Sequence, residues 1–265
     1  MNRRSAMSQA FRLPEILEIA RAEGKVTVED LAERFNVTVQ TIRRDLAELA
    51  ELGRLERVHG GAVLPSGVSN IGYEERRGLN RSAKVAIAKA CAREIPDGAS
   101  VFMNIGTSTE AVARELLHHK DLLVVTNNMN IANILVDNPD CDIIVAGGMV
   151  RRADGGLVGT LTMKAIEQFK FDLAVIGCSA MDEDGLLLDF DIQEVGVSQT
   201  IIAQSRRVFL VADQSKFKRN APARIASLQE VDALFMDHPL PAKLERKCRD
   251  WGVEVHIAED AGGAD

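Results

Sequence analysis

The chain has 265 residues, of which 46% are hydrophobic and 27% are charged. These ordinary values exclude a largely disordered chain and allow one or two domains with a real core. No uninterrupted apolar run approaches the ~18 residues that cross a bilayer, and no apolar segment follows the charged first residues. We therefore expect a cytoplasmic protein with no membrane partner and no secretory signal. The four cysteines form no CxxC pair, so we expect reduced thiols and no metal site.

The net charge of −7 is unevenly distributed along the chain. Residues 1–65 hold ten basic and ten acidic residues, so the rest of the chain carries the whole net charge. Arg43, Arg44, Arg54 and Arg57 gather late in this first segment. Because DNA affinity depends on local cations rather than on total charge, the acidic composition does not exclude a DNA-binding segment.

The composition divides the chain near residue 65. Residues 66–72 are weakly apolar and rich in turn formers, which is typical of a linker. We expect residues 1–65 to form one domain, residues 66–74 a linker, residues 75–258 a second domain and residues 259–265 a flexible tail.

The first segment predicts three helices. The first has an apolar stripe at helical spacing, and Pro14 suits its first turn. The stripe consists of Leu13, Ile16, Leu17 and Ala20. Thr27 opens a capping-box-like start of the second helix, and Thr38 is a good N-cap for a third helix over residues 39–52.

The third helix has one polar face. At 100° per residue, Gln40 and Arg44 lie about 160° and 200° from the core-facing Ile42, and Arg43 and Thr41 flank them. These side chains form hydrogen bonds with base edges and phosphates. A solvated helix face is the alternative, but two short capped helices before this one favour a recognition helix in the major groove.

A hairpin is predicted after the third helix. Two short strand-like pieces within residues 54–64 surround Gly60-Gly61. As a wing, this hairpin would bring Arg57 and His59 to the DNA backbone, which Thr38 would also contact. As an alternative, it only closes a small core.

The first segment resembles the DNA-binding domain of the DeoR-type bacterial transcription regulators. The resemblance rests on the run from Thr41 to Leu46, Thr-Ile-Arg-Arg-Asp-Leu, and on His59-Gly60-Gly61 downstream. It implies a winged helix-turn-helix that binds double-stranded operator DNA. Thr38 stands where the family usually has Ser, and both hydroxyls can cap the helix.

The second domain reads as α/β with a mainly parallel sheet. Seven continuous apolar runs predict strands that are buried on both faces. They are Val101–Asn104, Leu122–Thr126, Asp142–Ala146, Leu173–Gly177, Val208–Ala212, Ala233–Asp237 and Val253–Ile257. Most intervals are long enough for crossover helices, and such folds bind ligands beyond the carboxyl ends of their strands.

Polar residues and glycines follow these predicted strands. A Gly with three hydroxyl residues opens a helix after the first strand, which suits a phosphate, although simple N-capping is the alternative. Lys216 would supply a cation for a dianion, and Asp213 an acceptor for a hydroxyl. The predicted effector-binding residues are Gly106, Thr107, Ser108, Thr109, Asn127, Asn128, Gly147, Gly148, Asp213 and Lys216.

No catalytic residue is assigned. Carboxylates such as Asp189 and Glu194 are available near the fourth strand, but neither GxSxG nor HExxH occurs. Catalysis is compatible with the spacing and nothing requires it. We therefore expect no enzyme activity, no cofactor and no metal.

The second domain resembles the sensor domain of DeoR-type regulators, whose fold is related to ribose-5-phosphate isomerase and CoA transferases. The resemblance covers residues 75–258 and rests on the strand-end motifs, Gly159 and Asp213-x-Ser215-Lys216-Phe217. The isomerase's Lys-Gly-Gly-Gly stretch is missing. Residues 127–133 and 188–195 most resemble the glycerol-3-phosphate-responsive members, which implies glycerol-3-phosphate as inducer. The residues themselves predict a small phosphorylated polyol or sugar.

Together these features predict a repressor of a carbon-catabolic regulon, released from its operator by a phosphorylated metabolite. One winged module binds weakly, so we expect a homo-oligomer on repeated or palindromic half-sites. A repressor that responds to another sugar phosphate, an activator or dual regulator, and a sugar-phosphate isomerase with an accessory DNA-binding domain are the alternatives.

Overall fold

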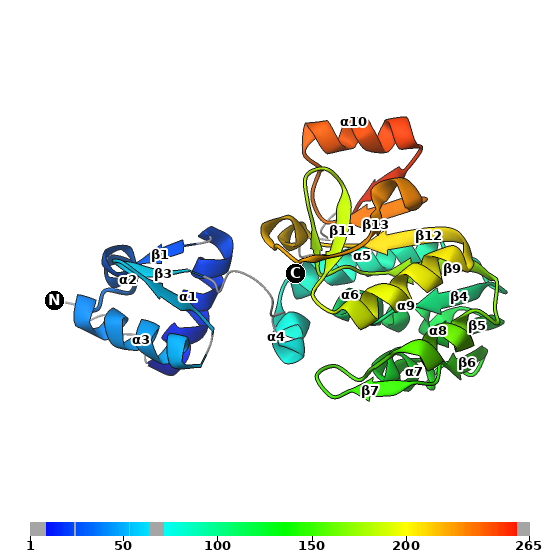
Figure 1. The fold of residues 1–265 in the computed structure, drawn as a ribbon, viewed down its shortest axis with the longest axis horizontal. Helices are drawn as coiled ribbons and strands as arrows, with labels where there is room; N and C mark the ends of the chain where they lie inside the picture. Colours follow the sequence, from blue (N-terminus) through cyan, green and yellow to red (C-terminus); the bar gives the residue numbers. More distant parts are fainter. Residues whose placement is uncertain (1–8, 24, 53, 64–71, 259–265) are drawn as a thin grey trace. The chain divides into compact units, whose positions relative to one another are not determined.

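The computed structural model describes residues 9–23, 25–52, 54–63 and 72–258 (Figure 1). The chain forms two compact units that divide after residue 67. Within the described ranges, no helix combines the length and the apolar character needed to cross a membrane. The predicted tail and most of the predicted linker lie outside the described residues, whereas Tyr73 and Glu74 already belong to a helix.

The first unit is a winged helix-turn-helix. Its helices are α1 (Gln9–Glu23), α2 (Val28–Phe35) and α3 (Val39–Glu51). Its antiparallel sheet has the order β1-β3-β2, from β1 (Lys25–Thr27), β3 (Gly61–Val63) and β2 (Glu56–Val58). The predicted caps are confirmed, because the Thr27 and Thr38 side chains accept hydrogen bonds from the first turns of α2 and α3. The turn of the wing is His59-Gly60, and Gly61 already belongs to β3.

The wing packs tightly against β1. A Cβ atom on Gly61 would lie 2.0 Å from the carbonyl oxygen of Val26, so only glycine fits there. Gly60 adopts a φ of +76°, a left-handed conformation that other residues rarely take. Gly60 therefore allows the turn of the wing, and Gly61 allows β3 to lie close to the backbone of β1.

The predicted position of Pro14 is wrong, because it lies inside α1 and not in its first turn. An earlier turn of α1 is anchored on α3 by polar side chains, which an apolar stripe does not reveal. Arg12 Nε donates to Asp45 Oδ2 at 2.6 Å, and both residues are buried. Gln9 Nε2 donates to Glu48 Oε2 at 2.7 Å.

The second unit contains a seven-stranded sheet in which every pairing is parallel. Its order is β15-β14-β12-β9-β4-β5-β6. The strands are β4 (Ser100–Met103), β5 (Leu122–Thr126), β6 (Cys141–Val145), β9 (Phe171–Ile176), β12 (Ser205–Val211), β14 (Ala233–Met236) and β15 (Glu254–Ile257). All seven predicted strands are confirmed, as is the α/β class.

Two layers of helices cover the sheet. Val101 and Met103 of β4 pack with the layer of α5 (Arg81–Arg93), α6 (Thr107–Glu115) and α7 (Met129–Leu135). Phe102 packs with the layer of α8 (Thr160–Ile166), α9 (Ile192–Ala203) and α10 (Ala242–Trp251). Burial on both faces explains why the inner strands are continuous apolar runs. The prediction is wrong for β6 and β15, which lie at the two edges of the sheet and are partly exposed.

Several short elements were not predicted. They are α4 (Tyr73–Gly78), β7 (Met149–Arg151), β8 (Gly156–Val158), β10 (Ala180–Met181), β11 (Leu186–Asp189), β13 (Ala223–Ser227) and the 3-10 turns η1 (Leu116–His118), η2 (Gln214–Lys218) and η3 (Leu228–Glu230). Strands β10, β11 and β13 form a small antiparallel sheet. All four cysteines are free thiols, and three of them are buried.

Candidate DNA-binding surface and effector pocket

The outward face of α3 carries the side chains that its periodicity predicts. Gln40, Arg43 and Arg44 are exposed, Thr41 is half-buried, and Ile42 is completely buried. Asp45, which lies beside Arg44 in the sequence, points inward to Arg12. The helix therefore separates a cationic recognition face from a core face that holds its own ion pair.

The start of α3 is locked by two threonines. Thr38 Oγ1 accepts from the Thr41 backbone N–H at 3.2 Å, and the two hydroxyl oxygens lie 2.9 Å apart. Both side chains are thus held at the helix end, close to Gln40. On the wing, Arg57 and His59 are exposed. All seven predicted DNA-binding residues lie at least partly exposed on the first unit.

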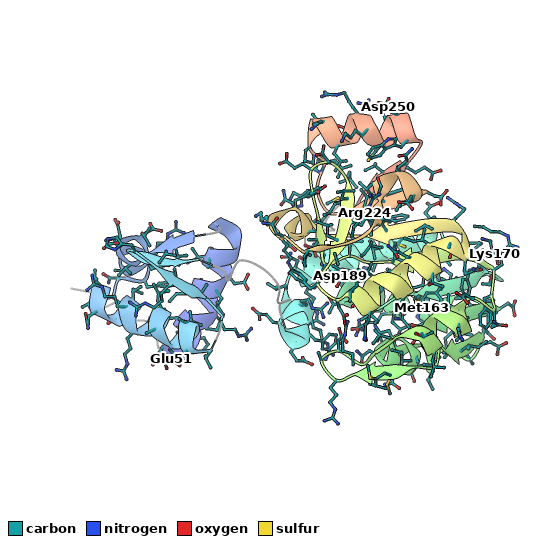
Figure 2. The ribbon with its side chains drawn as sticks, viewed as in Figure 1. Glu51, Met163, Lys170, Asp189, Arg224 and Asp250 are labelled. Atoms are coloured by element: carbon teal, nitrogen blue, oxygen red, sulfur yellow. The ribbon has the colours of Figure 1, made fainter. Side chains whose placement is uncertain are left out.

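In the second unit, a pocket lies at the carboxyl ends of three adjacent strands. Residues 105–108 follow β4, residues 177–179 follow β9, and Lys216 follows β12. Arg76 of α4, with Asp189 and Glu194, completes the lining; Asp189 is labelled in Figure 2. The structure therefore brings together four of the predicted effector residues, namely Gly106, Thr107, Ser108 and Lys216.

One side of this pocket is suited to an anion. The first turn of α6 begins there, and its free N–H groups and helix dipole favour negative charge. Burial lowers the pKa of the Lys216 ammonium, the nearby Arg219 lowers it further, and Asp213 opposes this effect. A bound anion would relieve the cost of burying these positive charges.

The other side of the pocket is acidic. Ser179 Oγ donates to Asp189 Oδ2 at 2.8 Å, and Arg151 pairs with Glu194 at 2.5 Å. Burial and the neighbouring Asp189 raise the pKa of Glu194 to about 7, although Arg151 opposes the shift. Carboxylate oxygens accept hydrogen bonds, so this side is suited to the hydroxyl groups of a polyol.

The remaining predicted effector residues do not line this pocket. They are Thr109, Asn127, Asn128, Gly147, Gly148 and Asp213. The Thr109 hydroxyl lies 2.8 Å from the carbonyl oxygens of Asn104 and Gly106, and so fixes the loop before α6. Asn128 caps α7, and Asn127 Nδ2 donates to the Leu157 carbonyl at 3.0 Å.

The two glycines and Asp213 also support the surrounding backbone. The Gly147 carbonyl accepts from Thr162 Oγ1 at 2.7 Å. A Cβ atom on Gly148 would lie 2.0 Å from the same hydroxyl oxygen. Asp213 caps the turn that carries Lys216 and accepts from Asn80 Nδ2 at 3.0 Å. Its contribution to the pocket is the placement of Lys216.

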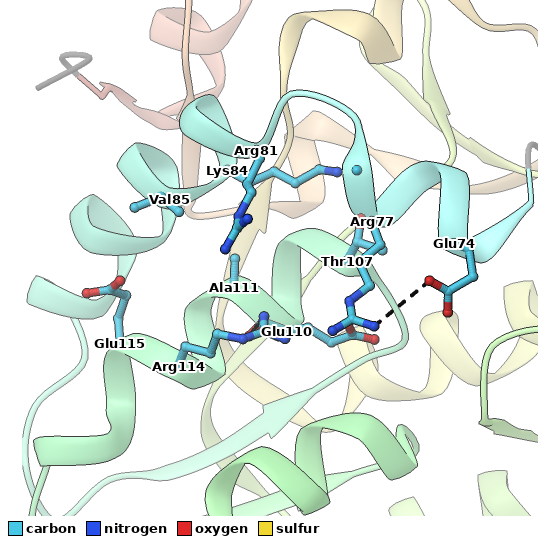
Figure 3. Close-up of a pocket in the computed structure, with 11 residues that line it drawn as sticks. Glu74, Arg77, Arg81, Lys84, Val85, Thr107, Glu110, Ala111, Arg114 and Glu115 are labelled. Carbon is cyan, nitrogen blue, oxygen red and sulfur yellow. Dashed lines mark hydrogen bonds and ion pairs between the residues drawn. The ribbon is translucent and has the colours of Figure 1, made fainter. Parts of the chain in front are cut away.

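A second, larger cavity of about 430 Å³ lies between α4, α5 and α6 (Figure 3). Charged side chains of both signs line it, and Arg77 pairs with Glu74 at 3.9 Å. Its Lys84 is engaged, since Nζ donates to the carbonyl oxygens of Arg76 and Leu79. The Lys84 ammonium is therefore committed to backbone carbonyl oxygens in this cavity.

Sequence reasoning missed Arg76 as a pocket residue. It lies on α4, outside the strands, in a stretch with no recognisable motif. The acidic lining residues were noticed only as candidates for chemistry. Their position on β11 and α9 depends on the small antiparallel sheet, which the sequence pattern does not predict.

Comparison with protein families matches both units. Residues 12–68 match the DeoR-like helix-turn-helix domain, and residues 79–238 match the DeoR C terminal sensor domain. Ribose 5-phosphate isomerase A from Methanocaldococcus jannaschii is a structural neighbour at 12% identity, with a TM-score of 0.39 and coverage of 52% of this chain and 55% of that one.

Two curated relatives match over most of their length. The glycerol-3-phosphate regulon repressor of Escherichia coli K12 is 43% identical over 95% of this chain and 100% of its own. The protein of the same name from Haemophilus influenzae is 45% identical over 86% of this chain and 89% of its own. The chain therefore belongs to the DeoR family, with its helix-turn-helix domain in the first unit and its sensor domain in the second.

Proposed function

We propose that this protein is a cytoplasmic transcriptional repressor that binds operator DNA and leaves it when its sensor domain binds glycerol-3-phosphate. The observation that carries the proposal is the cationic outward face of α3 in a chain 43% identical to a glycerol-3-phosphate regulon repressor. The two relatives described above are repressors by name, so the isomerase alternative finds no support in them.

In this proposal, α3 enters the major groove. Gln40 and Thr41 would contact base edges, and Arg43 and Arg44 guanine edges or phosphates. Thr38, Arg57 and His59 would hold the DNA backbone on either side. Phosphate contacts fix the register on the duplex, while base contacts select the sequence.

The effector would occupy the strand-end pocket. Its phosphate would meet the start of α6 and Lys216, and its hydroxyl groups would face Asp189 and Glu194. These two kinds of lining correspond to the two parts of a polyol phosphate. Induction requires tighter effector binding in the arrangement that does not bind DNA, with a typical coupling of ~1–3 kcal/mol.

A homo-oligomer would carry two or more recognition helices to matching half-sites. One winged module buries little DNA, so the gain in affinity from a second copy is large. A palindromic operator is the counterpart of twofold symmetry in the protein.

The proposal is tested by selecting bound duplexes from a random pool and titrating the selected operator with purified protein. Glycerol-3-phosphate should release the operator, whereas glycerol and inorganic phosphate at the same concentrations should release much less. Release by a different sugar phosphate only would overturn the assigned effector, and failure to select any duplex would overturn DNA binding. Turnover of sugar phosphates without DNA would favour the isomerase.

A further inference from the structure

The strand-end pocket is too small in this structure for a phosphorylated metabolite. It holds about 20 Å³, roughly the space of one water molecule. One wall consists of the ends of β4, β9 and β12, strands in the middle of the sheet. Those strand ends are largely buried, so displacing them would disrupt packed core contacts. A phosphorylated ligand enters only if another wall gives way.

Helix α4 is the wall that moves most easily. None of its residues is fully buried, although Tyr73, Glu75 and Arg76 are half-buried. Polar contacts hold it instead. Tyr73 OH donates to Glu110 Oε2 at 2.9 Å and accepts from Asn130 Nδ2 at 3.0 Å. Arg76 NH2 donates to Asp154 Oδ2 at 3.2 Å, and the Arg76 carbonyl accepts from Thr107 Oγ1 at 3.4 Å and from Lys84 Nζ. Water can replace such bonds at a net cost of about 0.5–1.5 kcal/mol for a neutral pair and about 1.5–3 kcal/mol where one partner is charged.

The guanidinium of Arg76 is incompletely paired. Its Nε is buried and makes no hydrogen bond within the part of the chain that the structure describes. Its partner Asp154 is also held by Arg151, through bonds of 2.9 and 2.7 Å. If Arg76 moves away, the buried Asp154 carboxylate therefore remains paired with Arg151. The planar guanidinium fork matches the oxygen atoms of a phosphate.

We propose that Arg76 is a phosphate ligand of the effector and that α4 is the lid of the pocket. This inference rests on the proposed function, since it assumes a small phosphate monoester as effector. The ligand enters as α4 lifts, and Arg76 then exchanges Asp154 for phosphate oxygens opposite Lys216.

Calorimetric titration of the full chain with glycerol-3-phosphate, and separately with inorganic phosphate, tests the role of Arg76. Arg76→Ala should weaken binding of both probes by about 10-fold to 100-fold, and Arg76→Lys by less. Arg77→Ala is the matched control, because it removes the same charge from the next, exposed residue, and it should bind like the wild type. Unchanged thermal unfolding of Arg76→Ala would show that its fold is retained, as expected for a helix with no fully buried residue.

Hydrogen exchange of residues 73–80 tests the lid. Adding ligand should slow this exchange in the wild type and leave it unchanged in Arg76→Ala. Equal affinities of Arg76→Ala and wild type, or no slowing in the wild type, would overturn the inference while the proposed function stands. If the wild type binds inorganic phosphate but not glycerol-3-phosphate, the assigned effector fails, and the same variants decide the role of Arg76 with inorganic phosphate. Binding of neither probe would overturn the inference.

Discussion

The polar groups on the outward face of α3 are exposed to solvent, whereas those of the strand-end pocket are largely buried and bonded to neighbouring residues. On α3, Gln40, Arg43 and Arg44 are exposed, and the core lies on the other side of the helix. In the strand-end pocket, the lining residues Asp189 and Glu194 are buried and already bonded to Ser179 and Arg151. A recognition surface on a helix can therefore change without unfolding the protein, whereas a strand-end pocket shares its residues with the fold.

The largest effect on stability is expected at Asp45, a charged residue on the core face of α3. Asp45→Ala removes a buried carboxylate that pairs with the buried Arg12, which should destabilise the first unit by ~3–5 kcal/mol in denaturant unfolding. Asp30→Ala is the control, because it removes a half-exposed ion pair of 3.0 Å with Arg34 and should cost ~1 kcal/mol or less. Equal losses would contradict a structural role for Asp45.

Arg44→Ala should weaken operator binding by about 100-fold in an anisotropy titration, since each subunit loses a contact worth ~1–3 kcal/mol. The unfolding midpoint and glycerol-3-phosphate affinity should not change, because Arg44 is exposed and far along the chain from the sensor domain. Lys164→Ala on α8 removes an exposed charge elsewhere and serves as the control. Wild-type operator affinity in Arg44→Ala would reject α3 as the recognition helix.

Lys216→Ala should lower the affinity for glycerol-3-phosphate by roughly 10-fold or more, through loss of a charge-assisted hydrogen bond. Operator binding without ligand should be normal, so the variant should repress and respond poorly to inducer. Lys218→Ala, an exposed lysine in the same 3-10 turn, should behave like the wild type. Normal induction in Lys216→Ala would remove Lys216 from the site.

A smaller effect, of a few fold, is expected from pH. The pKa of Glu194 is raised to about 7, so its carboxyl group loses a proton as the pH rises from 6.5 to 8. The carboxylate repels a phosphate dianion in the same pocket, so affinity should fall over this range and binding should take up a proton near pH 7. Calorimetry in buffers of different ionisation enthalpy measures this uptake.

Glu194→Gln should remove most of that pH dependence. A phosphate ester has its own second pKa near ~6, and it contributes a change of the opposite sign at the lower end of the range. A pH profile that is identical in the wild type and in Glu194→Gln would show that this carboxyl group does not sense the ligand.

The sequence alone predicts the elements whose pattern is local. Strands buried on both faces appear as continuous apolar runs, and helix caps depend on residues two or three positions apart. The start of β12 was placed three residues late, because Ser205, Arg206 and Arg207 are polar. Helix α4 and strands β10, β11 and β13 were missed, because they are short and depend on distant partners.

The same limit applies to the sites. The face of α3 follows from its own periodicity, and the strand-end rule finds Gly106 and Lys216. Arg76 and Glu194 come from helices outside the sheet, so only the folded chain brings them to the pocket. The rule also includes residues such as Thr109, which lie near a strand end but hold the backbone instead.

The most direct test of the central claim is the affinity for glycerol-3-phosphate measured with and without saturating operator duplex. If the sensor domain and α3 are thermodynamically coupled, the operator must weaken glycerol-3-phosphate binding by the same factor by which glycerol-3-phosphate weakens operator binding, about 5-fold to 150-fold. Identical glycerol-3-phosphate affinity in the presence and absence of operator would contradict the account, because a ligand with equal affinity for both states shifts nothing.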